Sequence, residues 1–381
     1  MKVTLWVRKL QEVLDLMSRF VSKHATLPIL ENVYIKGKVD SILLRATDME
    51  KYIEIELPAQ VDNEWALTIN AKTLSDIMRA IEEDQVTLQI DTTKDTLHIR
   101  SSSDEFTIKG IPASEYVAVP SIQTETAIIL QTADFSTWIG KVEYAVTEKN
   151  FSPVLTWVFL RTKEYDGKLH VVFVGTDSFR LAEYKIPFTG SKDTAFSMII
   201  PKVHINDIKK VADYARDHDT ETMKTTFSDN MVGFSFTVGE MSIHCMCLLI
   251  QGNFPEYENE NIMPTTYVTK VLVDTAQLDK AIKKIAILTR DINNFISLQT
   301  ADEKVKITSG ETDVGQGETS LTALIEGEVL QFGMNGKYIA DFLRTVEGDE
   351  VILQLVSAEK PVIFKDKDDE RFTYVVRPLI K

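Results

Sequence analysis

The chain has 381 residues, of which 44% are hydrophobic and 26% are charged. This composition is typical of a folded protein of two or three domains, and it excludes a disordered chain or a disulfide-stapled miniature. With 42 Lys and Arg against 57 Asp and Glu, the net charge is −15, which over the whole chain argues against a polyanion such as nucleic acid as a partner.

The sequence also narrows the expected cellular location of the protein. No apolar run is long enough to span a bilayer, and the first ten residues mix charged and apolar side chains, unlike a secretion signal. The two cysteines, Cys245 and Cys247, are two residues apart in a strand-like run, a spacing that disfavours a bond between them. We therefore expect a protein of the reducing cytoplasm without a membrane partner.

The predicted elements recur three times along the chain. Each copy opens with an alternating strand that leads into a helix with apolar residues at i, i+3 and i+4. A second strand-to-helix junction follows in each copy; Asn or Pro opens it, and an Asp precedes an apolar residue within it. The first junctions lie at residues 3–14, 128–139 and 268–282, and the second at 69–77, 200–208 and 334–342.

Other short motifs of the first copy also recur in the second copy, in the same order. Residues 28–30 (Pro-Ile-Leu) correspond to 153–155 (Pro-Val-Leu), and 46–48 (Ala-Thr-Asp) correspond to 175–177 (Gly-Thr-Asp). Any chain of strands and helices gives chance echoes, but several ordered markers favour true repeats. We therefore predict an α+β fold of three homologous domains.

Copies one and two also end alike, with Gly110–Tyr116 parallel to Gln251–Tyr257. Each of these segments leads into the next copy and so marks a domain boundary. The predicted domains span residues 1–122, 123–261 and 262–381.

The charge is distributed unevenly between the predicted elements. Six helical segments contain 18 Lys and Arg against 10 Asp and Glu, a net charge of +8, whereas the remaining residues carry −23. A basic helix is often only a solvated surface, but the net positive charge of the six segments together predicts a surface for a polyanion. Charges are screened beyond about 8 Å, so a polyanion near the helices would feel this local charge more than the distant acidic residues. The segments are residues 8–23, 72–81, 134–149, 202–216, 276–290 and 337–346.

Several motifs resemble those of a known family. Residues 175–182 (Gly-Thr-Asp-Ser-Phe-Arg-Leu-Ala), 251–257 and 374–379 are similar, in order and spacing, to the bacterial replicative sliding clamp, the beta subunit of DNA polymerase III. Residues 25–30 and 286–289 are similar to the same family. Each motif alone is weak, but the resemblance covers the whole chain.

The resemblance implies a DNA clamp fold, in which two helices of each domain face a central hole and β-sheets form the outside. Helices pack about 8 to 10 Å apart, so six in a circle would leave no room for a duplex about 20 Å wide. Twelve helices leave a bore of about 25 Å. The expected assembly is therefore a ring-shaped, head-to-tail homodimer.

The implied function is to encircle duplex DNA without reading its sequence and to keep DNA synthesis processive. The implied partners are the catalytic subunit of DNA polymerase III, the clamp loader and other proteins with a short hydrophobic clamp-binding peptide, in the cytoplasm and associated with the nucleoid. The candidate bore residues, chosen by helix position and charge with His24 added from the resemblance, are His24, Lys72, Arg79, Lys149, Lys202, Lys209, Lys283 and Arg344. The positions that match the family's dimer contact are Phe106, Ile287 and Leu288.

The family binds partner peptides in an apolar cleft between the second and third domains. The matching positions here are Leu155, Thr176, Ser178, Phe179, Arg180, Leu181, Pro255, Asn335, Tyr338, Val362, Val376, Pro378 and Leu379. Phe179 stands where His is frequent, Arg377 stands where an apolar residue is usual, and Glu258–Asn261 lengthen the loop that follows. The peptide preference is therefore expected to differ from that of relatives.

Motifs for catalysis are missing from the sequence. Gly333–Tyr338 is too short for a phosphate-binding loop, and Gly315–Gly317 reads as a flexible turn. His244–Cys247 has no second cluster to complete a metal site. We predict a protein that is not an enzyme and needs no cofactor or metal. The alternative to a clamp is a repeat-built protein-binding module that does not encircle DNA.

Overall fold

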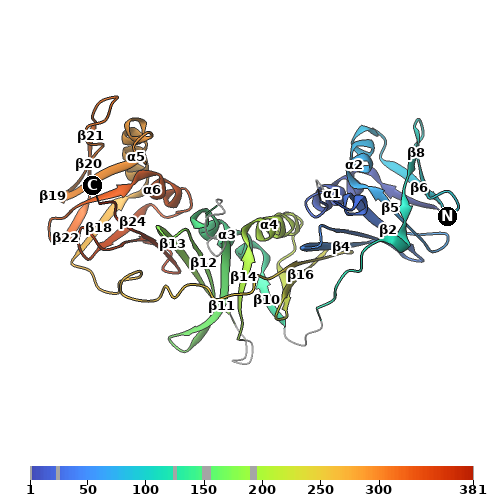
Figure 1. Ribbon diagram of the computed structural model, residues 1–381, viewed down its shortest axis with the longest axis horizontal. Coiled ribbons are helices and arrows are strands. Elements are labelled where there is room, and N and C mark those ends of the chain that lie inside the picture. Colours follow the sequence, from blue (N-terminus) through green and yellow to red (C-terminus); the bar gives the residue numbers. More distant parts are fainter. Residues whose placement is uncertain (1, 23–25, 123–126, 148–155, 189–194, 381) are drawn as a thin grey trace. The chain divides into compact units, whose positions relative to one another are not determined.

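The computed structural model describes residues 2–22, 26–122, 127–147, 156–188 and 195–380. The chain forms two compact units (Figure 1). The first unit contains residues 1–136 and 203–251, and the second contains 137–202 and 252–381. The division passes through the central repeat, so each unit combines a terminal repeat with part of the central one.

The first unit has two antiparallel sheets within its described residues. The four-stranded sheet has the order β1 (Lys2–Trp6), β6 (Gln85–Asp91), β7 (Thr96–Arg100), β8 (Glu105–Lys109). The nine-stranded sheet has the order β10 (Ala127–Gln131), β15 (Thr222–Phe227), β16 (Met231–Val238), β17 (Met241–Leu248), β4 (Lys51–Pro58), β3 (Ser41–Thr47), β2 (Asn32–Lys38), β5 (Trp65–Asn70), β9 (Ile111–Pro112). The helices are α1 (Val7–Met17), α2 (Ala71–Ala80), most of α4 (Lys202–Asp217), the start of α3 (Thr132–Val142) and the 3₁₀ turns Pro28–Glu31 and Ala113–Glu115.

The second unit repeats this plan over its described residues. Its four-stranded sheet has the order β21 (Glu318–Thr322), β20 (Lys304–Thr308), β19 (Phe295–Ala301), β23 (Gln331–Asn335). Its nine-stranded sheet has the order β14 (Ser197–Pro201), β11 (Trp157–Tyr165), β12 (Lys168–Thr176), β13 (Arg180–Pro187), β26 (Phe372–Val376), β25 (Val362–Asp366), β24 (Glu350–Leu355), β18 (Thr269–Asp274), β22 (Leu324–Gly327). The helices are α5 (Thr275–Thr289), α6 (Gly336–Leu343), the rest of α3 and the 3₁₀ turn Glu143–Ala145.

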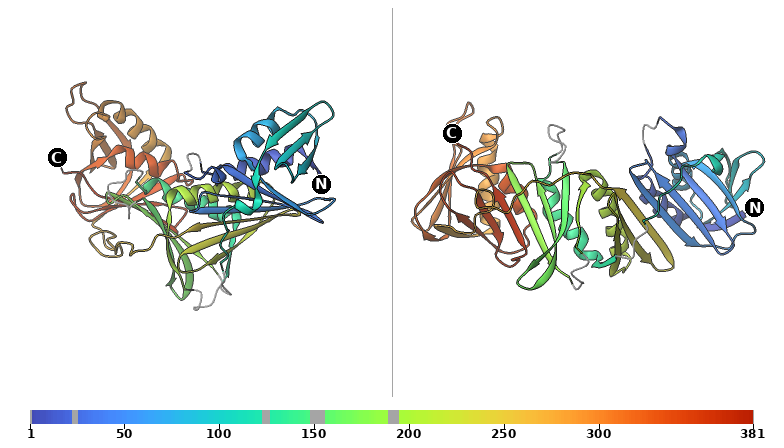
Figure 2. Two further views of the ribbon diagram at one scale, coloured as in Figure 1. Left: turned by 45° about the vertical axis from the view of Figure 1, so that its right-hand side comes forward. Right: turned by 60° about the horizontal axis from the view of Figure 1, so that its bottom comes forward.

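The helices of each unit lie on one side of its nine-stranded sheet (Figure 2). They do so because the predicted apolar spacing gives each helix one buried stripe. The predicted apolar stripes are confirmed, since the stripe residues of all three opening helices are buried. These are Leu10, Val13 and Leu14 in α1, Phe135, Trp138 and Ile139 in α3, and Leu278, Ala281 and Ile282 in α5.

The second helix of two repeats begins at a side-chain cap. The Asn70 side chain accepts a hydrogen bond from the Thr73 amide at 3.0 Å, and Asn335 accepts one from the Lys337 amide at 2.9 Å. Such caps satisfy amide groups that have no partner within the helix. The Asn that opens these predicted junctions therefore sets where the helix starts.

Three helices, α1, α3 and α6, end several residues earlier than predicted, and α6 ends at Leu343. Helix α1 ends at Met17, where the Ser18 hydroxyl donates to the Asp15 carbonyl at 2.7 Å and competes with the helical backbone pattern. Helix α3 ends at Val142, whose carbonyl oxygen lies 2.4 Å from the position that a Cβ of Gly175 would take. The missing side chain at Gly175 thus lets the end of α3 approach the sheet closely.

Each nine-stranded sheet joins strands of two successive repeats. Strand β4 pairs with β17 in antiparallel register from Lys51↔Cys247 to Glu56↔Ser242. Strand β13 pairs with β26 from Arg180↔Val376 to Tyr184↔Phe372. The contact between neighbouring repeats is therefore a ladder of backbone hydrogen bonds, which side-chain changes alone do not abolish.

The two cysteines are free and buried on β17. Burial raises the pKa of both thiols, because the thiolate would lose its hydration. Among the helices described, none is long and apolar enough to cross a bilayer.

The close approach at Gly175 predicts a position-specific cost. We expect Gly175→Ala to lower the free energy of unfolding by about 1 to 3 kcal/mol, because its methyl group would meet the Val142 carbonyl. Gly140→Ala in α3 is the control, since a Cβ there has no neighbour within 4 Å and Ala favours a helix by up to about 1 kcal/mol. Urea unfolding followed by circular dichroism measures both. Equal effects of the two changes would contradict this account.

Candidate functional site

A cavity of about 620 Å³ opens in the second unit. It lies where the β12–β13 turn, the segment from Phe254 to Ile262, the β24–β25 loop and the chain after β26 meet. Of the residues predicted for a peptide cleft, seven line this cavity. They are Thr176, Ser178, Phe179, Arg180, Leu181, Pro255 and Pro378.

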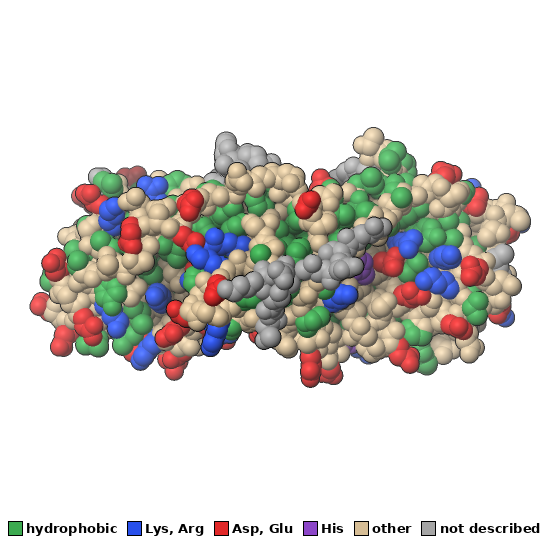
Figure 3. All heavy atoms as spheres, turned by 90° about the horizontal axis from the view of Figure 1, so that it is seen from below, with side chains coloured by type: hydrophobic (Ala, Val, Ile, Leu, Met, Phe, Trp, Pro, Cys, Tyr) green, Lys and Arg blue, Asp and Glu red, His purple; other side chains and the backbone are tan. Residues whose placement is uncertain are grey.

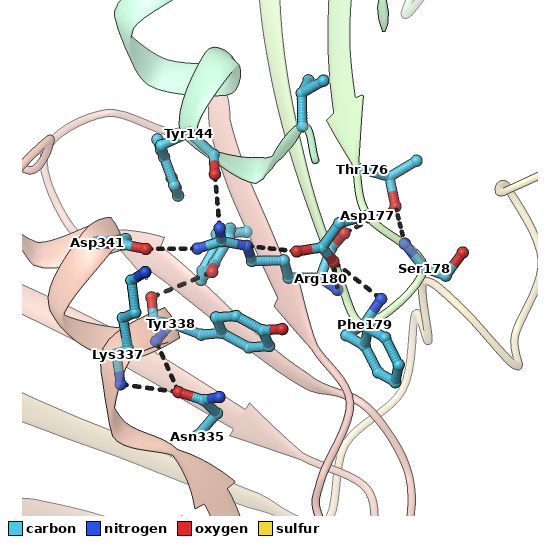
Figure 4. Close-up of polar contacts among 12 residues, drawn as sticks. Tyr144, Thr176, Asp177, Ser178, Phe179, Arg180, Asn335, Lys337, Tyr338 and Asp341 are labelled. Carbon is cyan, nitrogen blue, oxygen red and sulfur yellow. Dashed lines mark hydrogen bonds and ion pairs between the residues drawn. The ribbon is translucent and has the colours of Figure 1, made fainter. Parts of the chain in front are cut away.

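The β12–β13 turn is fixed by its own side chains (Figure 4). The Thr176 hydroxyl donates to the Arg180 carbonyl at 2.7 Å, and Asp177 accepts from the amides of Phe179 and Arg180, both at 3.0 Å. Ser178 takes a left-handed conformation with φ 73°. As a result the Phe179 ring is 54% exposed at the cavity, although a large apolar side chain favours burial.

The Arg180 guanidinium joins the turn to α6. Its Nε lies 2.9 Å from Asp177 Oδ2, its Nη1 lies 2.7 Å from Asp341 Oδ2, and its Nη2 donates to the Tyr144 carbonyl at 2.6 Å. The guanidinium also lies over the Tyr338 ring, 4.3 Å from its centre. Burial alone would lower its pKa, but the surrounding acidic groups raise the pKa above its usual value. Arg180 is therefore committed to holding the wall of the cavity.

Other predicted cleft residues do not line the cavity but make structural contacts next to it. Asn335 caps α6, and the Tyr338 carbonyl accepts a hydrogen bond from the Tyr374 hydroxyl at 3.1 Å. Val362 and Val376 pair across β25 and β26 and are fully buried. The Leu379 amide donates to the Gly333 carbonyl at 2.9 Å. Leu155, also predicted, lies outside the described residues.

The rest of the cavity lining was only partly predicted from the sequence. Phe254 and Tyr257 belong to the predicted 251–257 motif, and Phe254 stacks on Phe159 at 4.4 Å between ring centres. The loop 357–361 carries no apolar pattern, so nothing in the sequence marked it. The lining residues missing from the prediction are Phe254, Tyr257, Asn261, Ile262, Ser357, Glu359, Lys360, Pro361, Val375, Arg377 and Ile380.

The segment after Tyr257 is held by ion pairs against the strands of the central repeat. The Glu258 carboxylate lies 2.7 Å from Arg161 Nη2 and 2.6 Å from Lys163 Nζ. Burial would raise the pKa of Glu258, but hydrogen bonds from Lys163 and Arg161 lower it to about 2. The Tyr257 hydroxyl donates to the buried Glu183 at 2.7 Å. The segment that contributes Asn261 and Ile262 to the cavity lining is thus held in place by these contacts.

Four candidate bore residues project from helices into solvent. Lys72 is exposed on α2, and Arg79 on the same helix lies 2.5 Å from Asp15. Lys283 lies 2.6 Å from Asp279, and Arg344 lies 2.9 Å from Asp341. Exposed pairs of this kind contribute little to stability and leave the cations accessible to another anion.

The other candidate bore residues differ from these. Lys202 and Lys209 are half-buried; Lys202 donates to the Val146 carbonyl at 3.5 Å, and Lys209 lies 3.9 Å from Asp213. His24 and Lys149 lie outside the described residues.

The candidate dimer residues lie near strands at the edge of a sheet. Phe106 is half-buried on β8, an edge strand of the first unit. Ile287 on α5 is 67% exposed, and Leu288 is half-buried beside Gly317, which precedes the edge strand β21. In the described part of the chain, no cluster of side chains suits a metal ion.

The two cations that contact Asp341 allow a matched test of the cavity wall. We expect Arg180→Met to lower the free energy of unfolding by about 3 to 5 kcal/mol, because it leaves the buried Asp177 and Asp341 carboxylates without their main partner. Arg344→Met removes a 66% exposed partner of the same carboxylate, and we expect it to cost less than about 1 kcal/mol. Thermal and urea unfolding give the comparison, and similar costs would show that Arg180 is not a structural residue.

Comparison with known proteins identifies relatives of all three repeats. The family of the DNA polymerase III beta subunit matches with its N-terminal domain at residues 1–120, its central domain at 129–256 and its C-terminal domain at 260–380. The beta sliding clamps of Staphylococcus epidermidis and Staphylococcus aureus are each 28% identical over 369 residues, which is 94% of this chain and 94% of theirs.

Solved structures show the same fold. The DNA polymerase sliding clamp from Bacillus subtilis has a TM-score of 0.91 at 24% identity and covers 100% of this chain and 99% of its own. The polymerase III beta subunit of Caulobacter crescentus has a TM-score of 0.91 at 23% identity over 100% of both chains. The three family matches, the two relatives and the shared fold show that this chain belongs to the DNA polymerase III beta subunit family, the bacterial beta sliding clamps.

Proposed function

We propose that two copies of this chain join head to tail into a ring that encircles duplex DNA at the nucleoid. The chain is a noncatalytic DNA sliding clamp by its family. In the proposal, three domains at residues 1–122, 123–261 and 262–381 form each half of the ring, and the cavity tethers the polymerase, the clamp loader and other proteins through short hydrophobic peptides.

The observation that carries the ring is the strand pairing between repeats. We call the strand pairing between two neighbouring repeats a joint. In both observed joints, the third strand after the first helix of one repeat pairs with the third strand after the second helix of the next repeat. These pairs are β4 with β17 and β13 with β26. The counterparts in the remaining joint are β21 and β8, and each is an edge strand within the described residues. A second copy of the chain supplies the missing strand to each of them, which closes a ring of six domains.

Apolar side chains at these edges support the same assembly. Phe106 and Ile108 are the half-buried residues of β8 and share one face of the strand. Ile287 is exposed on α5, the helix that packs beside β21. Joining β8 to β21 would cover apolar surface that one chain leaves in water.

The exposed cations on the helices support DNA as the threaded ligand. Lys72, Lys283 and Arg344 attract phosphates, which carry no sequence information, so every register along the duplex has a similar energy. The excess of acid outside the helical segments would repel DNA from the other surfaces, and Figure 3 shows acidic side chains spread over the face that it draws. The ring would therefore hold DNA and still slide.

The cavity has the features of a peptide site. Its volume of about 620 Å³ falls in the range of about 300 to 1,000 Å³ that suits a ligand pocket. Phe179, Leu181, Phe254 and Val375 provide an apolar lining, and Thr176 and Ser178 provide a few polar groups. Such a lining anchors the large apolar side chains of a short peptide.

The proposed joint between copies can be tested at Ile287. We expect Ile287→Asp to raise the dimer dissociation constant at least about tenfold, because it places a carboxylate in an apolar contact. The side chain is 67% exposed in the single chain, so folding should be unaffected. Val329→Asp is the control, since Val329 is 64% exposed in the same unit. Sedimentation velocity over a concentration series gives both constants; an unchanged dimer in Ile287→Asp would remove Ile287 from the joint.

The DNA-facing role can be tested by reversing charge on two helices. We expect Lys72→Glu with Lys283→Glu to shorten the half-life of the loaded clamp on nicked circular DNA at least about tenfold and to flatten its dependence on salt, because phosphate contacts are lost. Lys94→Glu reverses a 76% exposed cation in a β-turn and serves as the control. Retention is measured by gel filtration of labelled clamp. Equal half-lives for both variants would contradict the proposal.

A further inference from the structure

The turn at the cavity has a close copy in the first unit. The Thr47 hydroxyl donates to the Lys51 carbonyl at 2.8 Å, as the Thr176 hydroxyl donates to the Arg180 carbonyl at 2.7 Å. Met49 has a φ of 78°, close to the 73° of the cavity turn. The two turns therefore have the same local structure.

Each turn makes the same two connections to the following repeat. Lys51 pairs with Asp207 on α4, as Arg180 pairs with Asp341 on α6. In both units, the first residue after the last position of β17 or β26 that pairs with β4 or β13 donates a backbone hydrogen bond to the turn. The Leu248 amide donates to the Glu50 carbonyl at 2.8 Å, and the Arg377 amide donates to the Phe179 carbonyl at 2.9 Å. Leu248 and Arg377 therefore occupy equivalent positions.

The walls of the cavity can then be matched to residues of the first unit. Strand register makes Leu181 equivalent to Tyr52 and Val375 equivalent to Met246. In the same register Pro361 is equivalent to Met231. The counterpart of the cavity is thus the cluster of Tyr52, Met231, Met246 and Leu248, whose members pack together.

This counterpart is filled by the chain itself. Val119 and Ile122, from the segment that leads into the central repeat, pack against the cluster. In the second unit the corresponding segment after Tyr257 begins with Glu258, which is held by Arg161 and Lys163 on the strands of the central repeat, and its Asn261 and Ile262 line the cavity. The cavity of about 620 Å³ lies over the residues equivalent to this cluster, since Leu181, Pro361, Val375 and Arg377 all line it. The first unit therefore indicates what the cavity can hold: a segment with two apolar side chains three residues apart.

One charge difference between the two sites lies on the chain that follows the paired strand. The filled site has Leu248, whereas the cavity has the exposed Arg377. Among the described residues, Arg377 makes no ion pair, while the Arg180 charge is matched by Asp177 and Asp341. Lys360 in the lining donates to Asn261 at 3.0 Å, and Glu359 is the acidic residue of the lining. An unpaired guanidinium beside an apolar surface selects a ligand that brings a carboxylate.

On the basis of the proposed function, we infer that Arg377 is a specificity-determining residue of the cavity. It selects partner peptides that carry an acidic side chain beside two apolar side chains spaced as Val119 and Ile122 are. The apolar pair fills the space that the chain's own segment fills in the first unit, and the acidic side chain pairs with the guanidinium.

The experiment uses the full-length protein and fluorescein-labelled peptides. The parent peptide is residues 116–122, Tyr-Val-Ala-Val-Pro-Ser-Ile. Asp or Asn replaces in turn each residue other than the Val and Ile that correspond to Val119 and Ile122. We expect one Asp peptide to bind at least about fivefold more tightly than its Asn partner, because only the carboxylate pairs with Arg377. Fluorescence anisotropy measures each dissociation constant.

Two variants decide which cation is responsible. Arg377→Leu gives the cavity the residue of the first unit, and we expect the preference for Asp over Asn to disappear while the Asn peptide binds as before. Lys360→Leu should keep the preference. A preference that survives Arg377→Leu, or that disappears in Lys360→Leu instead, would overturn the assignment, as would Asp and Asn peptides that bind equally at every position.

A second peptide tests the spacing. Moving the Ile one residue closer to the Val should weaken binding at least about tenfold, because one apolar side chain then misses its place. Equal binding would overturn the two-anchor pattern. Dimer formation and DNA retention are measured on the same proteins, so a failed peptide preference is distinguishable from a failed ring.

Discussion

The backbone pairing between successive repeats is the constraint on which the rest of the structure depends. Because β13 pairs with β26, the turn at Thr176–Leu181 is brought beside the chain after Val376, and the two together make the cavity. Because β4 pairs with β17, the same turn in the first unit meets the same part of the next repeat. The pairing also decides which strands remain at an edge, and hence where another copy can add.

The two observed joints have the same local structure at the turn but differ in the residues that pack over it. Their turns share hydrogen bonds, backbone angles and a buried cation that reaches an Asp of the next helix. They differ in the connecting segment, whose Val119 and Ile122 pack on the cluster in the first unit and whose Glu258 pairs with Arg161 in the second. In one joint the partly buried Val119 and Ile122 pack on the buried cluster, whereas in the other the ion pairs of Glu258 hold the connecting segment against the strands of the central repeat. The difference between a filled cluster and an open cavity thus lies in a few connecting residues.

Much of the fold could be predicted because it depends on local patterns. Apolar spacing predicted the opening helix of each repeat and the recurring junctions predicted the second, all of which lie in the described part of the chain. The repeated Asp207 and Asp341 pair with the buried cations of the turns. The end of α3 was not predictable, since the Val142 carbonyl meets Gly175 only in the folded chain. The pairing of β4 with β17 joins residues about 190 positions apart in the sequence, and no local pattern specifies such a register.

The candidate site was predicted to a similar degree. The residues of the β12–β13 turn were expected from the resemblance to the clamp family, and the turn carries its conformation in its own Thr, Asp and Arg. The loop 357–361 and Ile262 reach the cavity through tertiary structure alone. Val376 was expected in the cleft, but the alternation of β26 turns it to the core, and its neighbour Val375 lines the cavity instead.

The two cysteines have a practical consequence for studying this protein. Both thiols are buried within β17, and their raised pKa keeps them protonated at neutral pH, the form that alkylating reagents attack poorly. A cysteine introduced at an exposed position would therefore react with a maleimide dye far faster than either native thiol. Donor and acceptor dyes could be attached to the unaltered background, and opening of the proposed ring could then be followed by energy transfer in real time.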